Sequence, residues 1–207
     1  MDLSDAQMGE GNWNARRVSG GKLADPFGSG ARLDKIEERL DAIERKLDLT
    51  DNTTEPSFVW RPCYNYQAGR YADVDTIVYH YTAGSADAEQ IVDYWNTLKS
   101  PNRVSAHYII DRDGKLTRAV KESDTAWHAW KWNPQSIGIE VCAAPEERAT
   151  SAQYESLAWL TKDIMTRHSI KRITGHRFLG IATKCPGDVF KSQDDIDNWL
   201  GMWGIHV

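Results

Sequence analysis

The sequence predicts an α/β fold: a mixed β-sheet flanked by helices, preceded by an N-terminal tail and a short coiled-coil helix. From residue 58 onward, short β-branched and aromatic runs alternate with longer segments of helical apolar spacing, a pattern typical of a sheet covered by helices. Further upstream, apolar residues recur at alternating steps of three and four, which indicates a heptad seam. We therefore expect a tail at 1–30, a helix at 31–49, a linker at 50–58 and a folded domain at 59–207.

Size and composition limit the class of protein. A chain of 207 residues can form one mid-sized domain with a good core, plus an appendage. The net charge of −5, without a basic block to neutralise phosphates, argues against a nucleic-acid binder. Three cysteines are too few, and odd in number, for a disulfide framework. No stretch resembles a membrane span or the apolar part of a signal peptide, so we expect synthesis in a cytoplasm.

The N-terminal part has two predicted segments. Residues 1–30 are rich in Gly, Ser, Asp and Asn and are expected to be disordered or to serve as a docking tail. In 31–49, Leu at position a and Ile at position d favour trimers or tetramers, so a homo-oligomer is one expectation. The seam is a little over two heptads long, and a single amphipathic helix packed on the domain is an equal alternative. Its apolar positions are Leu33, Ile36, Leu40, Ile43 and Leu47.

The C-terminal domain divides into strand-like and helix-like segments. Helical spacing of apolar residues predicts helices, and β-branched or aromatic runs predict strands. Arg112-Asp113-Gly114 is a hairpin turn signal between two such runs. The predicted strands are Thr76–Tyr81, Ala106–Asp111, Lys115–Val120, Ser136–Cys142 and Lys171–Thr174, and the predicted helices are Ala86–Leu98, Ser151–His168 and Asp194–Trp203.

A short irregular stretch carries His176 and Cys185, with Gly180 between them and Pro186 directly behind. An imidazole and a thiolate on one loop suit zinc, which accepts nitrogen and sulfur ligands in a tetrahedron. His80, at the end of an apolar run, is the best candidate for a third ligand. Three protein ligands would leave the fourth position to water, as in catalytic zinc sites. A buried histidine beside a buried cysteine is the alternative for this pair.

Glu140 is the one acid in the apolar strand SIGIEVC. It faces either the core, where an unpaired charge is costly, or a cleft at the strand end. A salt-bridged structural acid is the alternative. Beside a metal, burial would raise the pKa of this carboxyl and the cation would lower it, and the sequence leaves open which effect is larger.

Five motifs in order resemble the zinc-dependent N-acetylmuramoyl-L-alanine amidases, a family that includes phage endolysins, recycling amidases and peptidoglycan recognition proteins. They are IVYHYTAG, VSAHYIIDRDGKL, AWHAW, NPQSIGIEV and GHRFLGIATKCPG, and they span about 76–190. The resemblance implies zinc bound by His80, His176 and Cys185, with Glu140 as general base. It also implies hydrolysis of the amide between N-acetylmuramic acid and L-alanine in peptidoglycan.

The sequence departs from the family pattern at two catalytic positions. Thr183 stands where many members have a lysine, and Lys184 follows one position later. Thr183 is the preferred donor to the tetrahedral oxyanion, and Lys184 is its competitor. Ala106 replaces a tyrosine that some branches use, which leaves Glu140 as the main acid-base candidate.

The remaining motif residues are expected to line the cleft. His107 and His128 are predicted substrate contacts or supports behind the metal ligands, and a hydrogen-bonded core histidine is as good a reading of His107. Trp127 offers an aromatic face for a glycopeptide, although tryptophans of this kind also pack in cores. Asn133 completes the predicted substrate-binding set.

Three functions are compatible with the resemblance. A phage or prophage lytic amidase, made in the host cytoplasm and acting on the cell wall after release, fits the complete ligand set and the lack of a signal peptide. A virion-associated wall-penetrating component would dock through residues 31–49. A non-catalytic peptidoglycan-binding module is the third, and the presence of Cys185 argues against it.

Overall fold

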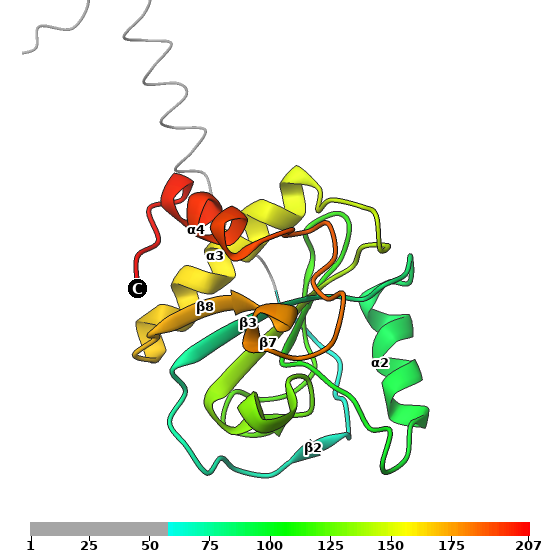
Figure 1. The fold of residues 1–207 in the computed structure, drawn as a ribbon. Coiled ribbons are helices and arrows are strands. Elements are labelled where there is room, and N and C mark those ends of the chain that lie inside the picture. Colours follow the sequence, from blue (N-terminus) through cyan, green and yellow to red (C-terminus); the bar gives the residue numbers. More distant parts are fainter. Residues whose placement is uncertain (1–57) are drawn as a thin grey trace, which may run out of the picture. The chain divides into compact units, whose positions relative to one another are not determined.

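The computed structural model describes residues 58–207, so the predicted tail, the predicted helix and all but the last residue of the predicted linker lie outside the described residues. The described chain forms a six-stranded mixed sheet in the order β1-β5-β4-β7-β3-β8. Figure 1 shows the neighbouring strands β7, β3 and β8 of this sheet. Strands β4 and β5 pair antiparallel and the other neighbours pair parallel. The strands of this sheet are β1 (Phe58–Trp60), β3 (Thr76–Tyr81), β4 (Tyr108–Ile110), β5 (Leu116–Arg118), β7 (Ser136–Val141) and β8 (Arg172–Gly175).

Helices and a small second sheet complete the domain. Each α-helix within residues 58–207 begins at a capping box, in which Asp87, Thr150 or Ser192 accepts a hydrogen bond from the backbone N–H three positions on, and the side chain at that position accepts one from the backbone N–H of the capping residue. These caps fix where the helices start. The remaining elements are α2 (Ala88–Thr97), α3 (Ser151–Arg167), α4 (Gln193–Met202), the 3-10 helices η1 (Trp130–Gln135) and η2 (His176–Leu179), and the two-stranded sheet of β2 (Tyr66–Gln67) and β6 (Thr125–Ala126).

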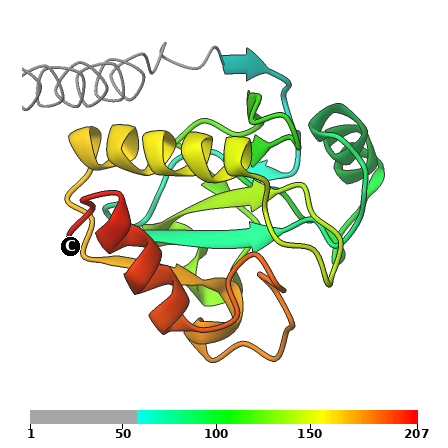
Figure 2. The same cartoon turned by 90° about the horizontal axis from the view of Figure 1, so that it is seen from above.

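Different helices pack on the two faces of the large sheet. Helices α3 and α4 lie together on one face, where they bury the larger apolar core against β3, β4 and β7 (Figure 2). Helix α2 packs with a second, smaller cluster that includes Ile109 of β4. Because successive side chains of a strand point to opposite faces, Tyr108 and Ile110 of β4 belong to the larger cluster and Ile109 between them to the smaller one.

This alternation places two polar residues next to each other. Tyr79 and Ile139 point into the core under α3 and α4, so the residues that follow them point to the other face. Those residues are His80 of β3 and Glu140 of β7, and they are partners in the register of the two parallel strands. Both stand near the carboxyl ends of their strands, where α/β sheets commonly place ligand sites.

The predicted elements and the observed ones agree in type and order. Thr76–Tyr81 matches its predicted bounds, and the hairpin turn at Arg112-Asp113-Gly114 joins two antiparallel strands as expected. The short strands β1, β2 and β6 and both 3-10 helices were not predicted. All three cysteines are free and buried. Within residues 58–207, no helix combines the length and the apolar character needed to cross a bilayer.

Candidate metal centre

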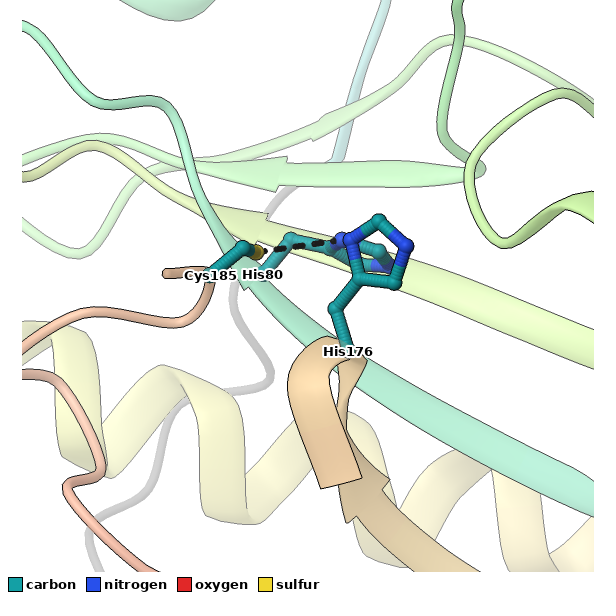
Figure 3. A group of neighbouring side chains, drawn as sticks. All are labelled: His80, His176 and Cys185. Carbon is teal, nitrogen blue, oxygen red and sulfur yellow. Dashed lines mark hydrogen bonds between the residues drawn. The ribbon is translucent and has the colours of Figure 1, made fainter. Parts of the chain in front are cut away.

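Three side chains from separate parts of the chain converge at one end of the sheet (Figure 3). His80 is on β3, and His176 directly follows the last residue of β8. Because Tyr79 pairs with Gly175, continuing the parallel register by one step brings the two histidines side by side. Cys185 comes from the loop after η2, which is tied back by a hydrogen bond of 2.9 Å from the backbone N–H of Arg177 to the carbonyl of Cys185.

The ligand atoms of these three residues all lie within 4.8 Å of one another. The Sγ of Cys185 is 3.4 Å from the Nδ1 of His80, and the ring centroids of His80 and His176 are 4.6 Å apart. His80 and Cys185 are buried, with 2% and 8% of their surface exposed, whereas His176 is partly exposed. The group is therefore open to solvent on the His176 side.

The surroundings keep both imidazoles neutral. Burial lowers the pKa of His80 well below its ordinary value, and the neighbouring rings of His128 and His176 lower it further. Burial also lowers the pKa of His176. A neutral imidazole has a free lone pair, which is the form that binds a metal ion.

Without a cation, the thiol of Cys185 is held protonated. Burial raises its pKa, and the carboxyl of Glu140 adds to this effect. A buried thiolate beside a carboxylate requires a compensating positive charge. Two neutral imidazoles and one such thiol, with converging ligand atoms, fit a divalent cation with borderline-soft character, and zinc matches this donor set.

Glu140 has a carboxyl group that nothing in the described chain satisfies. Its Oε2 atom is buried and has no hydrogen-bond partner among residues 58–207. Burial raises the pKa of Glu140 to about 8, so in the metal-free protein desolvation is the dominant effect on this group. A carboxyl with a pKa near neutrality, next to His80 on the adjacent strand, is suited to accept and release a proton.

The two candidate oxyanion donors lie just before Cys185. Thr183 is partly buried, and its Oγ1 accepts a hydrogen bond of 3.1 Å from the backbone N–H of Cys185. That bond uses a lone pair of the hydroxyl and leaves its proton available for donation. Lys184 is exposed.

A surface cleft begins at His176, one of the three metal-ligand candidates. Trp127, His128 and Asn133 line it together with His176, so three of the four predicted substrate contacts border one depression. Trp130 adds an indole that is 78% exposed. Asn133 also has an internal role, because its Oδ1 accepts hydrogen bonds from the backbone N–H groups of His128 and Ala129.

His107, the fourth predicted contact, lies apart from the cleft. Its side chain is 0% exposed, its Nδ1 accepts a hydrogen bond from the backbone N–H of Gly138, and its Nε2 is 2.8 Å from a guanidinium nitrogen of Arg70. These bonds favour the alternative, a core histidine, over a substrate contact. Arg70, which is half-buried, was not singled out in the sequence, because nothing local marks an arginine with these partners. It also donates hydrogen bonds to the carbonyls of Pro134 and Ser136.

The chain is similar in sequence to known amidases. A family model described as N-acetylmuramoyl-L-alanine amidase matches residues 70–188. The 1,6-anhydro-N-acetylmuramyl-L-alanine amidase AmpD of Haemophilus influenzae is 43% identical over 86 residues, which cover 38% of this chain and 46% of that protein. The N-acetylmuramoyl-L-alanine amidase A of Achromobacter lyticus is 31% identical over 115 residues, which cover 54% of this chain and 63% of that protein. The matches thus span only part of these relatives' length.

A solved structure has the same fold. The N-acetylmuramoyl-L-alanine amidase LysC from Clostridium intestinale URNW superposes with a TM-score of 0.62 over 73% of this chain and 99% of that one. At 22% sequence identity, this likeness concerns the fold alone. It confirms the predicted fold class, a mixed sheet flanked by helices.

Proposed function

Because the chain belongs to the N-acetylmuramoyl-L-alanine amidase family, we propose that it hydrolyses the amide bond between N-acetylmuramic acid and the L-alanine of the peptidoglycan stem peptide. The observation that carries this proposal is the convergence of the ligand atoms of His80, His176 and Cys185 next to the unpartnered carboxyl of Glu140. A metal-ligand set and a proton acceptor are thus brought together, and His176 of this set borders the cleft.

The chemistry divides between a cation and the protein. Zinc bound by the three ligands would polarise the scissile carbonyl and lower the pKa of a water molecule toward neutrality. Glu140 takes the proton of the attacking water and passes it to the leaving amine of L-alanine. The hydroxyl of Thr183 donates a hydrogen bond to the oxyanion that develops on the carbonyl, with the ammonium of Lys184 as the competing donor.

The cleft supports a glycopeptide substrate. Trp127 and Trp130 present indole rings beside His176, and aromatic faces pack well on the apolar faces of sugar rings. The side chain of His128 lines the same wall. The proposed substrate is therefore bacterial peptidoglycan, with the muramoyl-alanine amide placed at the metal-ligand end of the cleft.

The finer proposal is a lytic enzyme of phage or prophage origin that acts on intact cell walls. Its support is the fold shared with a protein described as an endolysin, the amidase LysCS from Clostridium intestinale URNW, over 97% of that chain. The relatives named AmpD are called 1,6-anhydro-muramyl amidases, so a soluble anhydro-muropeptide is the competing substrate. Turnover of intact sacculi at a rate well above that of the anhydro-muropeptide supports the lytic role, and the reverse preference contradicts it. A virion-associated role would depend on residues 31–49, outside the described chain.

The activity is tested by the products released from purified peptidoglycan. We expect free L-alanine amino termini, no new reducing sugar ends, and loss of activity on chelation. Glu140→Gln should lower kcat by about 10²- to 10⁴-fold, the usual contribution of a general base, while zinc content stays unchanged. Glu155→Gln, an exposed acid on α3, is the matched control and should leave the rate unchanged. Reducing ends in place of amino termini would contradict the proposal.

A further inference from the structure

His128 contacts His80 on the side away from the cysteine. The Nε2 of His80 is 3.0 Å from the Nδ1 of His128, and the two rings meet edge to face with centroids 5.1 Å apart. The other nitrogen of His80, Nδ1, is the one that faces the Sγ of Cys185. The two nitrogens of His80 therefore have separate partners, and only Nδ1 is placed to bind a metal ion.

The hydrogen bonds continue beyond His128 in a line. The Nε2 of His128 is 3.2 Å from the Oγ of Ser136, and that hydroxyl donates to the backbone carbonyl of Trp132 at 2.7 Å. A carbonyl can only accept, so the single proton of the Ser136 hydroxyl is committed to Trp132. The Oγ atom is then left as an acceptor for His128.

The donation from Ser136 to Trp132 fixes the direction of the hydrogen bonds between Ser136, His128 and His80. His128 carries its proton on Nε2 to donate to Ser136, which leaves its Nδ1 as an acceptor. His80 must then carry its proton on Nε2 to donate to His128. The Nδ1 of His80 is left with a free lone pair directed toward Cys185.

We infer that His128 and Ser136 are positioning residues that hold His80 in the one tautomer able to bind the metal through Nδ1. This inference rests on the proposed function, since it concerns the same zinc site. A metal-ligating histidine generally donates its second N–H to a fixed acceptor, which orients the ring. In this protein the acceptor is another histidine, whose own tautomer is fixed by a serine and a carbonyl.

Packing holds the His128 ring at this place. A Cβ atom at Gly138 would lie 2.6 Å from the Cγ of His128, so only glycine at this position of β7 lets the ring pack on the strand. Asn133 fixes the backbone, because its Oδ1 accepts from the N–H of His128 at 3.0 Å. Strand β7 therefore packs against the ring of His128, and Asn133 of η1 holds the backbone of the same residue.

The direct test is the tautomer of His80 in the metal-free wild-type protein. Long-range ¹H–¹⁵N NMR spectra of the histidine rings distinguish a proton on Nε2 from one on Nδ1. We expect the proton on Nε2 for both His80 and His128. A proton on Nδ1 of His80 would overturn the inference, and this result would not depend on any enzymatic activity.

A matched pair of variants tests the effect on zinc. Asn and Leu have nearly the same shape, but only Asn offers an oxygen acceptor near the position of the lost Nδ1. We expect His128→Leu to weaken zinc binding by about 10- to 100-fold, the usual effect of removing such a support, and His128→Asn to recover much of that loss. The zinc Kd would be measured by competition with a chromophoric chelator.

Two hydroxyl deletions complete the experiment. Ser136→Ala should weaken zinc binding less than His128→Leu, because His80 keeps its direct acceptor. Thr161→Val removes another fully buried hydroxyl, bonded to Tyr79 under the opposite face of the sheet, and should leave the zinc Kd unchanged. Wild-type affinity in His128→Leu would overturn the inference. A wild-type protein that binds no zinc would instead contradict the proposed function, and the tautomer of His80 would still decide the inference.

Discussion

Two largely buried carboxyl groups, Glu122 and Glu140, lie in opposite surroundings. Glu122 accepts hydrogen bonds from the hydroxyl of Tyr108 at 2.5 Å and from Arg167 at 2.8 Å, and its other oxygen is 2.8 Å from the Nε2 of His168. Glu140 has an Oε2 with no partner in the described chain. The first acid joins β4 to the end of α3, whereas the second is left unsatisfied beside the metal-ligand candidates.

The pKa values of the two acids follow from these contacts. Burial alone would raise the pKa of Glu122, but hydrogen bonds from Arg167, Tyr108 and His168 lower it to about 2. No such bonds oppose burial at Glu140, and its pKa rises to about 8. Burial by itself therefore does not decide the role of an acid, because the satisfied carboxylate of Glu122 stabilises the fold and the unsatisfied carboxyl of Glu140 stays available for proton transfer.

The largest effect on stability is expected for Glu122→Gln. The folded-state pKa of about 2 lies below the ordinary value of 4.5, so the stabilisation is present above pH 4.5 and is lost as the pH falls toward 2. Near neutral pH the variant should lose on the order of 3 kcal/mol of unfolding free energy. Urea unfolding of both proteins at a series of pH values measures this. An equal loss at every pH would contradict it and indicate a packing defect.

A smaller effect of opposite sign is expected for Glu140→Gln in the metal-free protein. The folded-state pKa of about 8 lies above the ordinary 4.5, so the stability of the wild type is fully present below pH 4.5 and falls as the pH rises toward 8. The amide is neutral throughout, so the advantage of the variant over the wild type should grow as the pH rises from 4.5 to 8. The buried amide adds N–H donors that also lack partners, which costs about 1–3 kcal/mol and leaves a net gain of about 1–3 kcal/mol near pH 8. Destabilisation at that pH would show that Glu140 has a partner in solution.

The sequence was sufficient to predict the type and the chain order of the main strands and helices. β-Branched runs and helical spacing predicted the strands and helices that carry the site, and two of the ligand candidates came from one irregular stretch. The strands β1, β2 and β6 are only two or three residues long, which is too short for a periodic pattern. The helix predicted at Ser151–His168 ends as expected, and His168 forms the C-terminal cap of α3 beside Glu122.

The sequence offered His107 and His128 as substrate contacts or supports of the metal ligands, but their hydrogen-bond partners could not be predicted because these bonds join distant segments. Arg70 reaches His107 across 37 positions of the chain, and His128 reaches His80 across 48. The direction of the pKa shift at Glu140 was also left open by the sequence. Only the folded chain shows that no cation or hydrogen-bond donor from residues 58–207 reaches its Oε2.

The central claim is that two imidazoles and one thiolate bind zinc at the end of the sheet. X-ray absorption spectroscopy of the zinc-loaded protein tests it most directly, because the method reports the atoms bonded to the metal. We expect one sulfur at about 2.3 Å and nitrogen ligands at about 2.0–2.1 Å, with the sulfur lost in Cys185→Ser. A zinc spectrum without sulfur in the wild-type protein, or one unchanged in Cys185→Ser, would contradict the account.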